Sequence, residues 1–354
     1  MKSIKTFSVL GVMSGTSLDG IDFCWVKFSN TNNWQFEIVE AQTIPYSIKW
    51  KEKLNQAHRL TSNNLARLNE EYSLFLSEAI AHFIAKKNII NLDFVASHGH
   101  TILHQPKNGI TLQIGNLQQI TNKLNLPVIC DFRVQDVQLG GQGAPLVPIG
   151  DRLLFGEYDS CVNLGGFANI SFEENKQRIA YDICPVNIVL NYFAEKLGVN
   201  FDEDGAIAKA NKHDDALLED LNRRTYYAEK SPKSLGKEWV EDEFLPIIET
   251  YKLSPEVIIA TLTHHAAYQI AKNLKPNQKV LVTGGGAFNS HLIRLLQSQT
   301  LAKIILPDNK IINYKEALIF AFLGVLRKLN QPNVLASVTG ASKNHSSGII
   351  HLPV

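Results

Sequence analysis

The stretch FSVLGVMSGTSLDGIDFCWVKF, residues 7–28, decides the fold class. Two apolar runs, Phe7–Met13 and Ile21–Phe28, flank the turn Ser14–Gly20, which is rich in glycine, serine and aspartate. Apolar runs on either side of such a turn predict two strands joined by a short connection. The next run, Trp34–Ile44, shows the alternation of a strand. Together the three runs predict an antiparallel meander.

The rest of the N-terminal part predicts a helix and two buried strands. Apolar residues recur at steps of three and four through residues 65–83, which is typical of an amphipathic helix. Phe94–Ser97 and Val128–Phe132 are short apolar runs, separated by a helical segment near Leu117–Leu124. We interpret both runs as buried parallel strands.

The second half repeats this order of elements. The expected strands are Ser160–Leu164, Ala168–Phe172, Ile179–Ile183, Lys279–Thr283 and Lys303–Leu306, and the expected helices start near Asn187 or span Ser290–Gln297 and Lys315–Leu329. Two halves of the type β-β-β-α-β-α predict an α/β fold of two lobes with a cleft between them. We expect an N-terminal lobe of residues 1–150, completed by the segment near 335–354, and a C-terminal lobe of residues 151–334. The polar stretch Asp202–Gly236 is interpreted as a surface insertion or mobile loop.

Composition and charge exclude several classes of protein. Hydrophobic residues make up 45% of the 354 residues and charged residues 19%, which is typical of a globular chain of about two domains. Lys and Arg number 35 against 34 Asp and Glu. A net charge of +1 does not favour a nucleic-acid or anionic-membrane partner.

The chain also lacks signals for membrane insertion, secretion and disulfides. The longest apolar run, Ala317–Leu326, is well short of the roughly 20 residues that a membrane-spanning helix needs. No N-terminal apolar core of secretory type is present. Cys24, Cys130, Cys161 and Cys184 are scattered and form no CxxC pair, so we expect a reduced cytoplasmic protein.

Three glycine turns indicate a nucleotide site. They are Gly15–Gly20, Gly165–Gly166 and Gly284–Gly286, and each follows an expected strand. Glycine lets the backbone approach a phosphate closely. Alone, the first turn is more often an ordinary hairpin with Asp-Gly chemistry, but three such turns in two lobes predict a nucleotide held across the cleft. Asp19 and Asp22 would repel phosphate directly, so they suit a magnesium ion or its water shell.

A fourth glycine loop, Gly140–Pro145, follows Arg133 and contains Gln142. This combination suits a polar ligand with hydroxyls and a carboxylate, which Arg133 can hold through two parallel hydrogen bonds. The alternative is that Arg133 pairs with Asp131 or Asp136 in a purely structural role.

Several histidines invite a metal interpretation, which we do not favour. On a strand, His98 and His100 share a face, but no third ligand completes a metal pattern, and His104 lies beyond the expected strand end. Hydrogen bonding to substrate or backbone is the preferred interpretation. His264 and His265 lie in a helix-like stretch and are expected to pack or cap.

The motifs themselves resemble a known family. Gly11–Asp22, GVMSGTSLDGID, is similar to the signature of the anhydro-N-acetylmuramic acid kinases. Further matching motifs are Ser97–Gly99, Asp131–Arg133, Gly140–Pro148, Asn163–Asn169, Gly284–Asn289, Glu316–Ala317 and Ser337–Ala341. The resemblance therefore extends over essentially the whole chain.

The resemblance implies the two-lobe actin-like or hexokinase-like fold, a duplicated ribonuclease H-like arrangement. It implies an ATP- and Mg²⁺-dependent kinase that opens the bridge of 1,6-anhydro-N-acetylmuramic acid with water and phosphorylates the freed O6. The product would be N-acetylmuramic acid 6-phosphate, in peptidoglycan recycling. A small amino sugar, and no nucleic acid or membrane, would be the partner, and a homodimer is compatible with this interpretation.

The resemblance also assigns residues. Asp182 would be the base that activates water, although a carboxylate capping the helix near Asn187 is the alternative. ATP and its phosphates would be bound by Gly15, Thr16, Ser17, Leu18, Asp19, Gly20, Ile21, Asp22, Gly165, Gly166, Asn169, Gly284, Gly285 and Gly286. The sugar would be bound by His98, Arg133, Gln142, Gly143, Asn187 and Glu316. Magnesium would be held by Asp19 and Asp22, directly or through water.

One motif departs from the family. The family sequence Asp-Thr-Gly-Pro-Gly-Asn corresponds here to residues 182–187, DICPVN, in which Ile183 replaces a hydroxyl residue and Cys184 and Val186 replace glycines. If a family glycine has positive φ, Val186 requires a different backbone, and the added side chains are expected to narrow the space for substrate. Leu235 also stands where the family usually has threonine. These changes leave open a kinase of another anhydrosugar or sugar, or a catalytically inactive sugar-binding relative.

Overall fold

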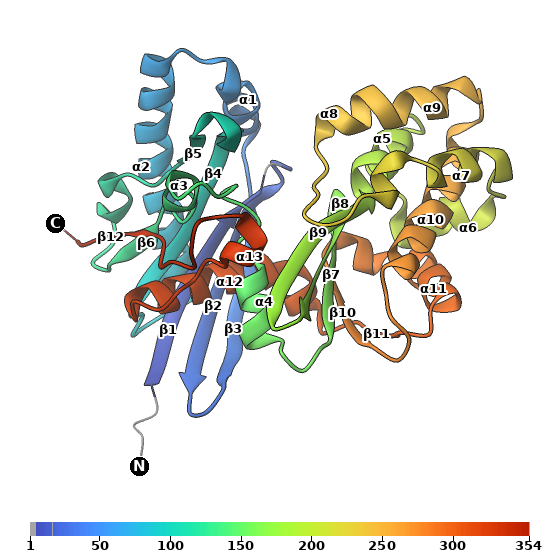
Figure 1. The fold of residues 1–354 in the computed structure, drawn as a ribbon. Helices are drawn as coiled ribbons and strands as arrows, with labels where there is room; N and C mark the ends of the chain where they lie inside the picture. The colour runs from blue at the N-terminus through green and yellow to red at the C-terminus, as the bar shows by residue number, and fades with distance from the viewer. Residues whose placement is uncertain (1–4, 16, 354) are drawn as a thin grey trace. The chain divides into compact units, whose positions relative to one another are not determined.

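The computed structural model describes residues 5–15 and 17–353, so Thr16 of the expected phosphate turn lies outside the described residues. The chain forms two compact units (Figure 1). Unit 1 contains the residues up to Leu154 and those from Tyr314 onward, and unit 2 is Phe155–Asn313. Both units are of the α/β type.

Unit 1 is built on a mixed sheet. Its strands are β1 (Lys5–Ser14), β2 (Gly20–Asn30), β3 (Trp34–Pro45), β4 (Phe94–Gln105), β5 (Ile110–Ile114), β6 (Val128–Cys130) and β12 (Ile349–His351). The order is β12-β6-β4-β1-β2-β3, and β5 pairs with β4. The first three strands are antiparallel neighbours, while β4 runs parallel to β1 and β6. The expected meander and the parallel pairing are therefore confirmed.

Two long helices cover opposite faces of this sheet. The helices of unit 1 are α1 (Ile48–Gln56), α2 (Ser62–Lys86), α3 (Val134–Gln138), α4 (Pro148–Leu154), α13 (Ala336–Thr339) and most of α12 (Asn309–Lys328), which begins in the last residues of unit 2. Leu10 and Val12 pack in one core with the apolar side of α2. Gly11, between them on β1, contacts α12 instead. Because successive residues of β1 point to opposite faces of the sheet, α2 packs on one face and α12 on the other.

Unit 2 repeats the same plan. Its strands are β7 (Ser160–Leu164), β8 (Phe167–Glu174), β9 (Gln177–Pro185), β10 (Lys279–Thr283) and β11 (Lys303–Ile305). The order is β11-β10-β7-β8-β9, with β7, β8 and β9 antiparallel and β10 parallel to both β7 and β11. This matches β6-β4-β1-β2-β3 in unit 1, position by position and direction by direction. The expected structural duplication is confirmed.

The helices of unit 2 include one long helix that the sequence patterns did not delimit. They are α5 (Asn187–Glu195), α6 (Ala206–Ala210), α7 (Asp215–Asn222), α8 (Lys237–Trp239), α9 (Leu245–Thr250), α10 (Pro255–Lys272) and α11 (Ser290–Gln299). α10 lies in the core of the unit, where His265 is buried and hydrogen-bonds to Tyr227 and Asn222. The expected packing role of His265 is confirmed.

The interpretation of Asp202–Gly236 as an irregular surface insertion is wrong. The segment contains α6 and α7, and Leu217 and Leu221 of α7 are fully buried in the core. Asp214 caps α7 by accepting a hydrogen bond from Leu217 N at 2.8 Å. One leucine per turn, within a strongly charged sequence, is enough to anchor a short helix.

Other differences concern short elements. The structure adds β5 and β12, extends β4 to Gln105, and has a 3-10 turn, Gln118–Thr121, where a helical segment was expected. Among the described residues, no helix is both long and apolar enough to cross a membrane.

Candidate active site

The turn between β1 and β2 presents backbone and a carboxylate to solvent. Leu18 N donates to Gly15 O at 3.3 Å, and Leu18 adopts a φ of +59°. Left-handed backbone is uncommon for a residue with a bulky side chain and is found preferentially at functional sites. Ser17 and Asp19 are exposed beside it. The turn is therefore accessible to a ligand, and its role in binding phosphate stays a prediction.

A buried hydrogen-bond network supports the end of β1 beneath this turn. Ser14 Oγ lies 2.7 Å from both Tyr46 Oη and His100 Nδ1, and Tyr46 also hydrogen-bonds to Tyr72. Burial lowers the pKa of His100 to about 4, so the ring is neutral at physiological pH. His100 therefore has a positioning role rather than that of a charged ligand.

Asp22 on β2 lies next to the turn and feels the charge of Asp19. Thr43 Oγ1 donates to Asp22 Oδ1 at 2.5 Å. Burial raises the pKa of Asp22, the Thr43 hydrogen bond opposes this, and the charge of Asp19 raises it further. A divalent cation would offset the repulsion between the two carboxylates, and carboxylate oxygen suits Mg²⁺.

The two residues fit only part of a magnesium site. Across the described residues, no group of three or more His, Cys, Asp or Glu side chains is arranged to hold a metal ion. An ion held by Asp19 and Asp22 would take its other ligands from phosphate oxygens and water, which is usual for Mg²⁺.

Arg133, which follows β6, is held by two hydrogen bonds. Its Nε donates to His98 Nε2 at 2.8 Å and its Nη1 donates to Gly143 O at 2.7 Å. Among the described residues Nη2 makes no hydrogen bond, so this end of the planar fork can bind a carboxylate. The structural alternative, a pairing with Asp131 or Asp136, is not what the geometry favours. Among the described residues Asp136 makes no direct hydrogen bond to Arg133; burial lowers the pKa of Arg133, and the charges of Glu316 and Asp136 raise it.

His98 supports Arg133. Because Nε2 accepts from Arg133, the ring proton is on Nδ1, which lies 3.0 Å from Gly99 O. Burial and the Arg133 charge hold the pKa of His98 well below its usual value, so the ring stays neutral. The backbone hydrogen bond expected for His98 is therefore present, and its contact with Arg133, which orients the guanidinium, is one that sequence reasoning missed.

Glu316 on α12 brings these groups into one region of unit 1. Its side chain is exposed to solvent, yet surrounding protein raises the pKa of its carboxyl. Arg133 lowers that pKa and Asp22 raises it, so Glu316 lies within electrostatic reach of both. A buried ion pair, Lys315 Nζ to Asp151 Oδ1 at 2.8 Å, anchors this part of α12. Gln142, also expected here, is exposed, and its backbone N donates to Thr339 O.

In unit 2, the two glycine turns meet at the ends of neighbouring strands. Gly165–Gly166 follows β7 and Gly284–Gly286 follows β10, and these strands are parallel neighbours. Gly284 has a φ of +84°, and a Cβ there would lie 2.8 Å from Leu164 O. Only glycine fits this position. Ligands of open α/β sheets bind outside the carboxyl ends of such strands.

Asn187 lies among these turns. Its Nδ2 donates to Leu164 O at 3.2 Å and its backbone N donates to Gly165 O at 3.3 Å. A Cβ on Gly286 would lie 3.6 Å from Nδ2. Asn187 therefore belongs with the glycine turns of unit 2, whereas the other five expected sugar-binding residues lie in unit 1.

A row of polar side chains crosses the sheet of unit 2. Thr283, Asn163, Asn169 and Asp182 are register partners on β10, β7, β8 and β9. Their apolar strand neighbours pack into the core, so the row lies on the opposite face. Sequence reasoning assigned no role to Asn163 or Thr283. The sequence did contain a signal for Asn163: it lies between the apolar residues Val162 and Leu164, so strand alternation places its side chain on the face opposite the core.

Asp182, at the end of this row, is held by a segment distant in sequence. Leu235 N donates to Asp182 Oδ2 at 2.9 Å, and Tyr226 Oη donates to the Asp182 backbone O at 2.6 Å. Burial raises the pKa of the carboxyl, and the Leu235 hydrogen bond opposes this. The N-cap of α5 is Val186 and has no side-chain capping bond, so the alternative that Asp182 caps this helix is not borne out.

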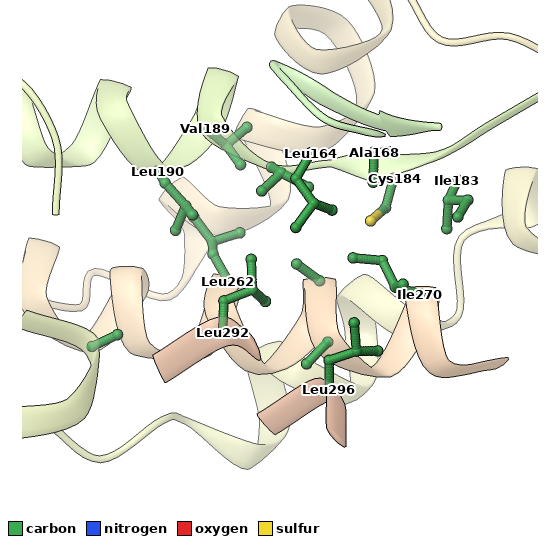
Figure 2. Close-up of a cluster of buried hydrophobic side chains, with 14 of the residues drawn as sticks. Leu164, Ala168, Ile183, Cys184, Val189, Leu190, Leu262, Ile270, Leu292 and Leu296 are labelled. Carbon is green, nitrogen blue, oxygen red and sulfur yellow. The ribbon is translucent and has the colours of Figure 1, made fainter. Parts of the chain in front are cut away.

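The altered motif sends its new side chains into the core. Ile183, Cys184 and Val186 are all buried among core residues. Figure 2 shows Ile183 and Cys184 in the buried cluster that includes Ile270. Val186 has a φ of −131° and a ψ of −96°, so its backbone is not in the left-handed region that favours glycine. The expectation that these side chains narrow a ligand space is therefore wrong, because they point away from the polar row.

Comparison with known proteins gives one consistent match. A profile of the anhydro-N-acetylmuramic acid kinase family matches residues 7–353. The anhydro-N-acetylmuramic acid kinase of Hydrogenovibrio crunogenus is 32% identical over 364 aligned residues, which cover 97% of this chain and 98% of the relative. The proteins of the same description from Aliivibrio fischeri and Mannheimia succiniciproducens are 34% and 33% identical, with similar coverage.

Similarity to solved structures is weaker. The activator of the 2-hydroxyisocaproyl-CoA dehydratase from Clostridium difficile, with bound ADPNP, matches with a TM-score of 0.43 and 15% identity, over 91% of this chain and 97% of that chain. A ROK family glucokinase from Streptomyces griseus, in complex with glucose and AMPPNP, matches with a TM-score of 0.39 and 12% identity, over 89% and 97%.

Proposed function

Since the chain belongs to the anhydro-N-acetylmuramic acid kinase family, we propose that it is an ATP-dependent sugar kinase acting on 1,6-anhydro-N-acetylmuramic acid. Water opens the anhydro bridge while O6 accepts the γ-phosphoryl group. The product is N-acetylmuramic acid 6-phosphate, formed in peptidoglycan recycling. Units 1 and 2 are the two lobes of this kinase. The need for ATP supports a cytoplasmic location. Analytical ultracentrifugation would test whether the protein forms the homodimer with which this interpretation is compatible.

The proposed chemistry rests on the surroundings of Asp182. A half-buried carboxylate with a raised pKa, oriented by the Leu235 N–H, is suited to take a proton from water. As the water oxygen bonds to the anomeric carbon, the bond from that carbon to O6 breaks. O6 then bonds to the γ-phosphorus, and the bond to ADP breaks. The charge that develops on O6 is thereby absorbed by phosphoryl transfer.

The remaining residues bind and orient. In unit 1, the open end of the Arg133 fork suits the lactyl carboxylate that distinguishes a muramic acid, and Glu316 suits its hydroxyl or amide groups. In unit 2, the glycine turns and Asn187 suit the nucleotide. Magnesium, held in part by Asp19 and Asp22, would neutralise phosphate charge.

The structure weakens the case for a different or lost activity. Those alternatives were motivated by Ile183, Cys184 and Val186, and these side chains lie in the core. The other departure from the family motifs is Leu235. Its backbone N–H donates to Asp182, and this bond does not depend on which side chain stands at position 235.

The test is turnover with a panel of sugars. ADP release with 1,6-anhydro-N-acetylmuramic acid should exceed that with N-acetylmuramic acid and with ordinary hexoses. In short reactions in oxygen-18 water, the label should appear on the anomeric oxygen and not on the phosphate. Product incubated in labelled water for the same time controls for exchange. ADP release with none of the anhydrosugars, or label in the phosphate, would overturn the proposal.

A further inference from the structure

The C-terminal motif Ser337–Ala341 has no role in the mechanism above, but its contacts point to one. We propose that Thr339 and Asp136 are a positioning pair, which fixes the loop Gly140–Gly143 and through it Arg133. The pair would thereby set the affinity for the carboxylate-bearing group of the sugar. This inference rests on the proposed function and names residues that neither the motif comparison nor the mechanism assigns.

Asp136 is a fully buried carboxylate with partners on both oxygens. Oδ2 accepts from Gly143 N at 2.7 Å, and Oδ1 accepts from Thr339 Oγ1 at 2.8 Å. His345 Nε2 lies 3.6 Å from Oδ1. Burying a carboxylate is costly unless its oxygens are hydrogen-bonded, so the loop is strongly favoured in the one conformation that supplies these donors.

Thr339 bonds to both Asp136 and the loop. Besides the hydroxyl contact with Asp136, its carbonyl oxygen accepts from Gln142 N at 2.8 Å. Ser342 N also donates to Leu139 O at 3.0 Å. A segment about two hundred residues later in the chain thus bonds to α3, to the residue that follows α3 and to the glycine loop itself, so it fixes the loop from both ends.

The glycine content of the loop follows from Asp136. A Cβ on Gly141 would lie 2.2 Å from Asp136 Oδ2 and collide with the carboxylate. Gly141 N donates in turn to the Asp136 backbone O at 2.8 Å. The loop therefore wraps directly around this side chain.

The link to Arg133 runs through Gly143. Its N–H is bound by Asp136 and its carbonyl oxygen accepts from Arg133 Nη1, so one residue joins the buried carboxylate to the guanidinium. If Asp136 or Thr339 loses its bond, the carbonyl that orients Nη1 is free to move. A fork that is no longer pre-oriented binds a carboxylate less tightly, while the chemical step at Asp182 is unaffected.

The experiment compares two substitutions of Thr339 by steady-state kinetics. Thr339→Val keeps the shape but removes the hydroxyl, and should raise KM for 1,6-anhydro-N-acetylmuramic acid about tenfold, with kcat within about threefold and KM for ATP unchanged. Thr339→Ser restores the hydroxyl and should return KM toward the wild-type value. Asp136→Asn keeps an acceptor for Gly143 N–H and should give an intermediate rise.

Thr263→Val is the matched control. Thr263 is also fully buried, and its hydroxyl donates to Ile259 O at 2.8 Å in unit 2. It should lower the melting temperature without changing KM for the sugar. A Thr339→Val or Asp136→Asn protein with native circular dichroism and unchanged KM would overturn the pair while leaving the proposed function intact. A wild type that neither binds nor phosphorylates the sugar would overturn both.

Discussion

The two units share a strand order but differ in the chemistry at the ends of their strands. Unit 1 gathers charged groups, among them Asp22, Arg133 and Glu316; burial raises the pKa of Glu316, the charge of Arg133 lowers it, and that of Asp22 raises it. Unit 2 presents amides, a hydroxyl and glycine turns, with the single carboxylate Asp182 in its polar row. In the proposed function, the same scaffold would therefore support charge recognition in one copy and proton transfer with neutral hydrogen bonding in the other. Duplicated folds diverge where strands end, because side chains there are not needed for the core.

The largest effect is expected from removing the base in unit 2. Asp182→Asn keeps an acceptor for the Leu235 N–H but cannot take a proton, so kcat should fall about 100- to 10,000-fold. ATP affinity, measured by calorimetry, should be retained, since the glycine turns are untouched. Phosphorylation at close to the wild-type rate would remove the functional distinction between the units.

The next effect concerns the altered motif. Restoring glycine in the double variant Cys184→Gly/Val186→Gly deletes two fully buried side chains and should lower the free energy of unfolding by about 2–5 kcal/mol. Turnover per folded molecule should not rise, because these side chains point into the core. Urea unfolding and kinetics measure the two outcomes, with Cys130→Gly as a core control in unit 1. A faster double variant would mean that the motif restricts the substrate after all.

A smaller effect is expected in the glycine turns, where a control variant separates backbone strain from loss of nucleotide binding. Gly284→Ala places a Cβ at positive φ and against Leu164 O, which should cost on the order of 1–3 kcal/mol and raise KM for ATP. Gly198→Ala is the control, since Gly198 also has positive φ, +79°, but an added Cβ meets nothing within 4 Å. Equal KM values for ATP in the two variants would count against the nucleotide role of the turn.

The smallest effect is expected for charge recognition in unit 1. Arg133→Lys keeps the charge but loses the planar fork, so KM for the muramyl sugar should rise about tenfold. An anhydrosugar that lacks the lactyl carboxylate should be affected much less, and competition assays would compare the two. Equal losses on both sugars would show that Arg133 serves the fold or that the substrate class is wrong.

Much of the fold was predictable because its signals are local. The strands of both meanders are apolar runs, the first turn of each meander contains glycine, and the periodicity of α2 spans many turns. β5 and β12 are short strands without a strong alternating pattern, and their pairing depends on neighbours distant in sequence. Asp202–Gly236 was misinterpreted because its charged composition concealed two buried leucines.

The candidate site was predictable in its residues but not in its contacts. The glycine turns, Asp182 and Arg133 stand out in the sequence by their types and spacing. That His98 supports Arg133, and that Leu235 holds Asp182, depends on hydrogen bonds between residues 35 and 53 positions apart. Local patterns contain no information on such pairs.

The sequence by itself determined the three-strand meander, the helix after it and the parallel strands of each unit, the positions of its glycine turns and the family, because backbone preferences and motifs are written in consecutive residues. Only the tertiary structure decided which way the side chains of Cys184 and Val186 point, and that the C-terminal segment bonds to Asp136. The reason is physical. The direction of a side chain depends on strand register and on the core that packing creates, and Thr339 reaches Asp136 only once the sheet of unit 1 has brought the two ends of that unit together.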